Sequence, residues 1–161
     1  MEAFKTVKNE IPNAKLWIVG LGDEKDRLEK LVKDLELNDV IFWGYVSEKE
    51  KFELLRKSWV YVICSEKEGF GISVIEANAV GTPAVGYRVL GLVDSIKDGY
   101  NGLLVEDKDI IKLSETLINL LKDYDLREEL SENAIEWAKQ FSWDKSAEEF
   151  ERVLKMVVNN G

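Results

Sequence analysis

Short apolar runs alternate with helix-like segments along most of this chain, and this alternation constrains its fold more than any other feature. The runs at 16–19 and 40–43 are short and almost wholly apolar, as expected for buried strands. The segment 24–37 between them places leucine and valine on one face at helical spacing. Further strands are predicted at 60–63, 84–87 and 103–105. Alternating β and α elements predict an α/β fold with a doubly wound parallel sheet.

Both ends of the chain have helical patterns. Near the amino end, Phe4, Val7 and Ile11 lie on one helical face, and Pro12 closes that helix. From residue 109 onward the pattern is helical only, and we expect a C-terminal helical cluster that covers the sheet. Its apolar positions are Leu113, Leu117 and Leu121 on a first face and Ala147, Phe150, Val153, Leu154 and Val157 on the last, with Ser142 as an N-cap. Because no low-complexity linker interrupts the chain, a single domain over residues 1–161 is predicted.

The composition indicates a globular domain and argues against several classes of partner. A chain of 161 residues with 45% hydrophobic content buries roughly 70% of its unfolded surface. The single cysteine, Cys64, excludes disulfides within the chain, and its apolar surroundings predict a packed thiol. A net charge of −9 argues against nucleic acid and anionic membranes. No run approaches the roughly 20 apolar residues of a transmembrane segment, and the amino end lacks a signal-peptide pattern, so we expect a cytoplasmic protein.

Histidine is absent from the sequence. Its absence removes the commonest general base and the usual transition-metal ligand, so zinc and iron chemistry are disfavoured. We therefore expect neither a metal site nor a cofactor.

The run from Glu68 to Glu76, with the sequence EGFGISVIE, carries the strongest functional signal. It follows an apolar strand, so it lies at the carboxyl end of that strand, where open α/β sheets bind their ligands. The helix that begins within the run would offer unpaired N–H groups to an anion. Gly69 and Gly71 allow close backbone approach, and the two carboxylates can accept hydrogen bonds from sugar hydroxyls. A nucleotide sugar presents this combination, a diphosphate between two diols.

The run resembles the E-x7-E signature of retaining glycosyltransferases with the GT-B fold, in particular family 4 (group 1) and its C-terminal nucleotide-sugar-binding domain. Four further blocks are similar to this family in the same order. They lie at residues 14–23, 40–46, 91–105 and 141–143. The resemblance implies a Rossmann-like half of a GT-B fold, a nucleotide-diphosphate sugar as ligand, and sugar transfer to an acceptor without bound metal.

The resemblance also implies roles for particular residues. Glu68 is placed against the transferred sugar as the catalytic candidate, and Glu76 against the ribose hydroxyls. Substrate-binding positions are implied for the rest of the signature and for two loops near the phosphates and the base. These positions are Gly69, Phe70, Gly71 and Ile72 in the signature, Gly20 and Gly22 in the first loop, and Tyr45 and Val46 in the second.

Several local features have a structural alternative. Ser73 with Glu76 fits an S-x-x-E capping box, in which Glu76 would serve the helix rather than a ligand. The glycines at 20 and 22 fit a tight turn equally well, and the third glycine of a dinucleotide fingerprint is missing. Tryptophans 17, 43 and 59 lie in or beside strand patterns, and we expect them to pack in the core rather than stack on sugar.

The resemblance covers nearly all of this chain but under half of a complete enzyme. In the family, this domain opens with a strand carrying an arginine and a loop carrying a lysine, and both hold the donor phosphates. The present sequence begins in the helix that follows, so Lys5 and Lys8 are not matches. It also lacks the N-terminal acceptor-binding domain, which is implied as a partner in cis or in trans. Without its first, central strand the sheet either closes up with five strands or has another segment in the gap.

Two other function classes remain open on the sequence. The chain could be a noncatalytic sugar-nucleotide-binding or interaction module that kept the fold. An unrelated doubly wound protein such as a receiver domain is disfavoured, because no acidic cluster lies at successive strand ends.

Overall fold

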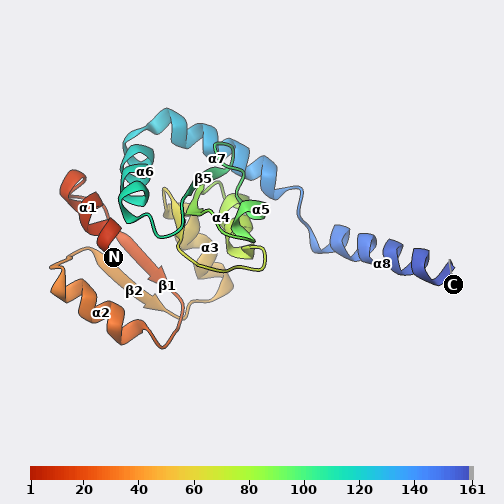
Figure 1. Cartoon of the computed structure of the whole chain (residues 1–161), viewed down its shortest axis with the longest axis horizontal. Coiled ribbons are helices and arrows are strands. Elements are labelled where there is room, and N and C mark those ends of the chain that lie inside the picture. The colour runs from red at the N-terminus through yellow and green to blue at the C-terminus, as the bar shows by residue number, and fades with distance from the viewer. Residues whose placement is uncertain (160–161) are drawn as a thin grey trace.

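The computed structural model describes residues 1–159 and has the alternating α/β organisation that the sequence predicts (Figure 1). The strands are β1 (Leu16–Val19), β2 (Val40–Gly44), β3 (Tyr61–Ile63), β4 (Ala84–Tyr87) and β5 (Gly102–Val105). The first helices are α1 (Glu2–Glu10), α2 (Lys25–Asp34), α3 (Glu48–Lys57), α4 (Ile72–Ala79) and α5 (Leu92–Ser95). The last three helices are α6 (Ile110–Lys122), α7 (Tyr124–Ala138) and α8 (Trp143–Asn159).

All strand pairs are parallel, but the strands form two sheets rather than one. β1 pairs with β2, and β3, β4 and β5 pair in that order. Within residues 1–159 no hydrogen-bonded ladder joins β1 to β3. A closed five-stranded sheet, one of the two expected outcomes, is therefore wrong for this chain. The parallel α/β class is confirmed, because each parallel connection runs through a helix.

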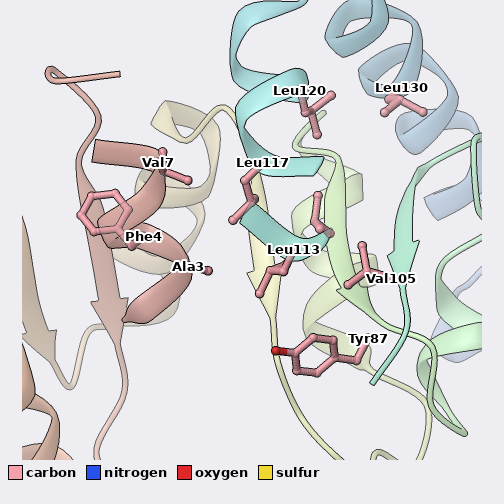
Figure 2. Packing of buried hydrophobic residues seen from close by; sticks show 10 residues of the cluster. Ala3, Phe4, Val7, Tyr87, Val105, Leu113, Leu117, Leu120 and Leu130 are labelled. Atoms are coloured by element: carbon pink, nitrogen blue, oxygen red, sulfur yellow. The ribbon is translucent and has the colours of Figure 1, made fainter. Parts of the chain in front are cut away.

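Side-chain packing, not a ladder, holds the two sheets together. Phe4 and Val7 of α1 join one hydrophobic cluster with Leu113 and Leu117 of α6, as Figure 2 shows. Partly buried side chains from both sheets pack against the same cluster, including Leu16 of β1 and Val62 of β3. Burial of apolar surface therefore links segments that share no backbone hydrogen bond. A second cluster lies beneath α4 and α5 and contains Ile63, Val74, Ala84, Leu92 and Ile96.

The expected C-terminal helical cluster is confirmed for α6 and α7 and wrong for α8. Leu117 and Leu120 of α6 and Leu130 of α7 are buried in the core. Helix α8 extends away from the rest of the molecule (Figure 1), and its side chains from 143 to 158 are exposed. Its apolar face is present as predicted, yet Phe150 is 65% exposed because no other described element packs against it. The N-cap prediction holds, since the backbone N–H of Lys145 donates to Ser142 Oγ at 3.1 Å.

Two of the three tryptophans predicted for the core lie at the surface instead. Trp43 is 44% exposed and stacks edge-on with Trp17, their ring centroids 6.0 Å apart. Trp59 is 59% exposed and lies under the guanidinium of Arg127, with Cζ 4.4 Å from the ring centroid. Strand patterns indicate apolar surroundings but not which faces become covered. Cys64, expected as a packed thiol, is likewise exposed, because it lies beyond the last residue of β3.

Candidate functional site

The loop between β3 and α4 ends in a glycine that no other residue replaces without strain. Gly71 has a φ of 80° and forms the N-cap of α4. A Cβ at this position would lie 2.8 Å from Ser95 Oγ and 3.0 Å from a Leu92 methyl carbon. Glycine therefore allows the chain to turn into α4 tightly against α5. No side chain caps this end of α4, so its first N–H groups lack the partner that a capping side chain provides.

Glu76 does not form the capping box that its spacing from Ser73 allows. Helix α4 begins at Ile72, so Ser73 already lies inside the helix, and the N-cap is a glycine without a side chain. The S-x-x-E match at Ser47 does form a complete box: Glu50 N–H donates to Ser47 Oγ at 3.3 Å, and Ser47 N–H donates to Glu50 Oε2 at 2.8 Å. The capping box considered for Ser73 and Glu76 is therefore not formed.

The carboxylate of Glu76 instead pairs with a lysine from the preceding helix. Lys51 Nζ of α3 donates to Glu76 Oε1 at 2.8 Å, and both side chains are half-buried. Lys51 also contacts Glu48, with Nζ 2.9 Å from Oε2. Partial burial lowers the pKa of Lys51, but hydrogen bonds to Glu76 and Glu48 outweigh this effect and raise it. Lys51 is therefore a cation at neutral pH.

Tyr61 of β3 is influenced by both carboxylates of the signature. Burial raises the pKa of its phenol, and the negative charges of Glu68 and Glu76 raise it further. The charges of both carboxylates therefore act on one side chain, which belongs to the first residue of β3. Tyr61 stays a neutral phenol at physiological pH, able to donate and accept hydrogen bonds.

The segment that carries Glu68 is held in place from two sides. Gly91, which precedes α5, packs directly against the backbone of Glu68. Phe70 stacks on Phe141 with ring centroids 5.3 Å apart, and Phe141 in turn stacks on Trp137 of α7. Glu68 and Phe70 are half-buried and Gly69 is exposed, so the loop presents its backbone to solvent while its flanks are fixed.

The other predicted positions lie at the carboxyl ends of the first two strands. Gly20 follows β1 with a φ of 123°, and its N–H donates to the carbonyl of Gly44 at 2.8 Å. Gly22 is exposed in the same loop. Tyr45 is 80% exposed and Val46 half-buried, both between β2 and α3. These two loops lie together. Helix α3 connects them to the signature, because it starts after Val46 and its Lys51 side chain pairs with Glu76.

The structure thus places the predicted residues in two groups, one after the strands of each sheet, and the ion pair from Lys51 of α3 to Glu76 connects α3 to the group that follows β3. One holds Glu68, Gly69, Phe70, Gly71, Ile72 and Glu76, and the other Gly20, Gly22, Tyr45 and Val46. The sequence analysis missed Lys51 and Tyr61, and no sequence signal pointed to either residue, because Tyr61 begins β3 and Lys51 lies within α3. Within residues 1–159 no group of three or more His, Cys, Asp or Glu side chains is arranged to hold a metal ion.

This arrangement is that of the Rossmann-like C-terminal domains of GT-B glycosyltransferases. Residues 1–137 match the family described as glycosyl transferases group 1, and the chain belongs to that family. A poly(glycerol-phosphate) alpha-glucosyltransferase of Bacillus subtilis is 33% identical over 98% of this chain.

Two solved structures are similar to this chain in fold. One contains bound UDP, and the other is a C-terminal domain. A Staphylococcus aureus TarM variant, in complex with Fondaparinux, alpha-GlcNAc-glycerol and UDP, superposes with a TM-score of 0.87 and 27% identity over 94% of this chain and 31% of that one. The C-terminal domain of a group 1 glycosyl transferase, LpcC of Francisella tularensis, has a TM-score of 0.76 and 26% identity over 86% of this chain and 75% of that one.

The chain spans only part of its full-length relatives. It covers 24% of the Bacillus subtilis enzyme and 42% of a Bacillus anthracis N-acetyl-alpha-D-glucosaminyl L-malate synthase. Among the described residues no helix combines the length and apolar character that crossing a membrane requires.

Proposed function

We propose that this chain is the donor-binding domain of a retaining glycosyltransferase that transfers a sugar from a nucleoside-diphosphate sugar to an acceptor. One observation carries the proposal: the uncapped start of α4 lies between Glu68 and Glu76 at the carboxyl end of β3. Free N–H groups and the positive end of the helix dipole suit a diphosphate. A carboxylate on either side suits the hydroxyls of the transferred sugar and of the ribose.

The roles of the residues follow from the chemistry of the ligand. Glu76 accepts hydrogen bonds from the ribose, and the amides of Gly71 and Ile72 lie toward the diphosphate. Glu68 contacts the transferred sugar. In the reaction the acceptor oxygen forms the new bond to the anomeric carbon, the bond from that carbon to the diphosphate breaks, and the acceptor proton leaves with the nucleoside diphosphate. The family membership and the UDP-bound TarM structure support this reading.

Binding by this chain alone is expected to be weak and independent of metal. The two basic phosphate contacts implied for the family are missing, and each is worth roughly 1.5–3 kcal/mol, which lowers affinity by about two to four decades. Calorimetry with UDP-, GDP- and ADP-glucose, with and without a metal chelator, measures this. Tight binding that the chelator abolishes would contradict the proposal.

A carboxylate substitution tests the role of Glu76. We expect Glu76→Gln to weaken nucleotide binding without unfolding the chain, because a polar side chain of the same shape remains. Glu53→Gln on the exposed surface of α3 is the matched control, since it removes the same charge away from the loop. Equal affinities for the two variants would count against Glu76 as a ribose ligand.

Transfer itself requires more than this chain. Positioning of the acceptor and exclusion of water supply much of the rate, and in GT-B enzymes the second domain provides the acceptor side. We expect no turnover by the purified chain and Glu68-dependent transfer once a first strand and an N-terminal domain are supplied. A radiolabelled nucleotide-sugar assay reads both outcomes. Robust transfer by the isolated chain would refute the two-domain proposal, and a reconstituted enzyme indifferent to Glu68→Ala would refute the role of Glu68.

A further inference from the structure

The ion pair between Lys51 and Glu76 joins α3 and α4, two helices that contact each other although β3 lies between them in the chain. Lys51 Nζ lies 2.8 Å from Glu76 Oε1, and it is anchored a second time by Glu48 of its own helix at 2.9 Å. The side chains of Lys51 and Glu76 are 25% and 28% exposed. Such a half-buried, doubly anchored pair is more ordered than an exposed surface pair, which gains little from its geometry. Within residues 1–159 the Glu76 carboxylate accepts its side-chain hydrogen bond, from Lys51, at Oε1.

We propose that Lys51 is a positioning residue for nucleotide recognition, which fixes the carboxylate of Glu76 through Oε1 and leaves Oε2 to accept hydrogen bonds from the ribose. The proposal rests on the proposed function, since it needs Glu76 to be the ribose ligand. It adds a residue that the Glu68 to Glu76 signature does not contain. Lys51 reaches the site from α3, 25 residues earlier in the chain.

Pre-ordering gives this pair its effect on binding. A free glutamate side chain samples several rotamers, and a ligand that binds it must restrict them. Lys51 restricts Glu76 before the ligand arrives, so the cost of ordering falls on folding rather than on binding. Releasing one such side chain weakens binding by about three- to tenfold.

The charge of Lys51 offers a competing explanation for any loss of affinity, because a cation attracts a diphosphate wherever it lies nearby. The two effects differ in their target. Attraction to the diphosphate is the same for a ribose and a dideoxyribose nucleotide, whereas ordering of Glu76 matters only when the ribose hydroxyls are present. The ratio of the two affinities therefore separates positioning from bulk electrostatics.

The experiment measures binding of UDP and of its 2′,3′-dideoxy analogue by NMR titration, on the wild-type chain and on variants. Lys51→Met is expected to reduce the preference for UDP about three- to tenfold. Lys51→Arg, which keeps a cation able to pair with Glu76, is expected to restore most of that preference. Lys49→Met on the same helix removes an equal charge from an exposed position and is expected to leave the ratio unchanged.

The outcomes distinguish this inference from the proposed function. A Glu76→Gln chain that keeps the full preference for UDP, or a wild-type chain without any preference, removes Glu76 as the ribose ligand and the proposed role of Lys51 with it. If Glu76→Gln loses the preference while Lys51→Met keeps it, only the positioning role fails. Tighter binding of UDP by Lys51→Met would also overturn it, because Lys51 would then occupy the space that the ribose needs. Should Lys51→Met fail to fold, Glu48→Gln tests the same anchor and is expected to lower the ratio by a smaller factor.

Discussion

Gly91 packs against Glu68 so closely that a Cβ at position 91 would lie 2.2 Å from the Glu68 carbonyl oxygen. Gly91 also has a φ of 85°, a conformation that side chains rarely adopt. The turn before α5 therefore supports the backbone that carries the proposed catalytic carboxylate. Its contribution comes from the absence of a side chain, which allows two backbone segments to touch.

Gly91→Ala is expected to displace the Glu68 loop. Its clash with Glu68 should lower the free energy of unfolding by about 1–3 kcal/mol in addition to the cost of the strained backbone at position 91. Gly99→Ala is the matched control, because Gly99 has a similar φ of 76° with no atom within 4 Å of its missing Cβ. That variant meets only the left-handed backbone penalty of about 1–2 kcal/mol. Urea unfolding of both variants measures the difference, and equal losses would show that the contact with Glu68 has no energetic weight.

A buried pair of asparagines connects α4 to the segment before β5. Asn101 Nδ2 donates to Asn78 Oδ1 and to the carbonyl of Ser95, and Asn101 Oδ1 accepts from Lys97 N–H at 2.6 Å. Asn101→Ala removes the partner of Asn78 Oδ1 and of the Lys97 N–H, at about 1–3 kcal/mol for each group left unsatisfied, whereas the Ser95 carbonyl still accepts from Trp137 Nε1. We expect a marked drop in the urea midpoint, whereas Asn119→Ala at an exposed position of α6 changes stability little. Similar midpoints for both variants would contradict this role for the network.

The capping box of α3 provides a prediction that depends on pH. Ser47→Ala is expected to cost about 1 kcal/mol of stability at neutral pH, and Ser47→Thr much less. Hydrogen bonds from Ser47 lower the pKa of Glu50, so the folded state holds this carboxylate ionised below its usual range. The stability that ionised Glu50 contributes is fully present above its unfolded-state pKa and is lost as pH falls through its folded-state pKa. The stability gap between wild type and Ser47→Ala should therefore narrow on acidification; a constant gap from pH 7 to 3 would count against the link.

Removal of α8 tests whether the core depends on it. Truncation after Ser142 keeps Phe141, which packs against Phe70, and the side chains that it removes between residues 143 and 158 are exposed. We expect the urea midpoint to stay close to that of the full chain, with changes of about 0.5 kcal/mol, while helical circular dichroism decreases. Phe141→Ala in the full chain is the contrasting variant and should loosen the loop that carries Phe70. A large loss of stability on truncation would mean that α8 packs on the core in solution.

Local signals made much of the fold predictable. The strand at 16–19 and the strand at 84–87 were predicted with the observed limits, because short apolar runs between turn residues identify buried strands. The glycine turn into α4 was also predictable from local sequence, since few residues other than glycine adopt its backbone conformation. The S-x-x-E pattern was less informative: it occurs four times, at residues 47–50, 65–68, 73–76 and 146–149, and of the matches at Ser47 and Ser73 only the first forms a box.

The sequence by itself therefore determined the order of strands and helices, the position of the signature at a strand end and the family of the chain. Those properties depend on periodicity and on residues close together in the chain. Only the tertiary structure decided that the strands form two sheets, that Trp43 and Trp59 are exposed, and that Lys51 meets Glu76. Each of these depends on which distant segments cover a given face, and on whether a packing partner lies within the described residues. Hydrophobic burial is non-directional, so an apolar pattern specifies that a face is to be covered but not by what.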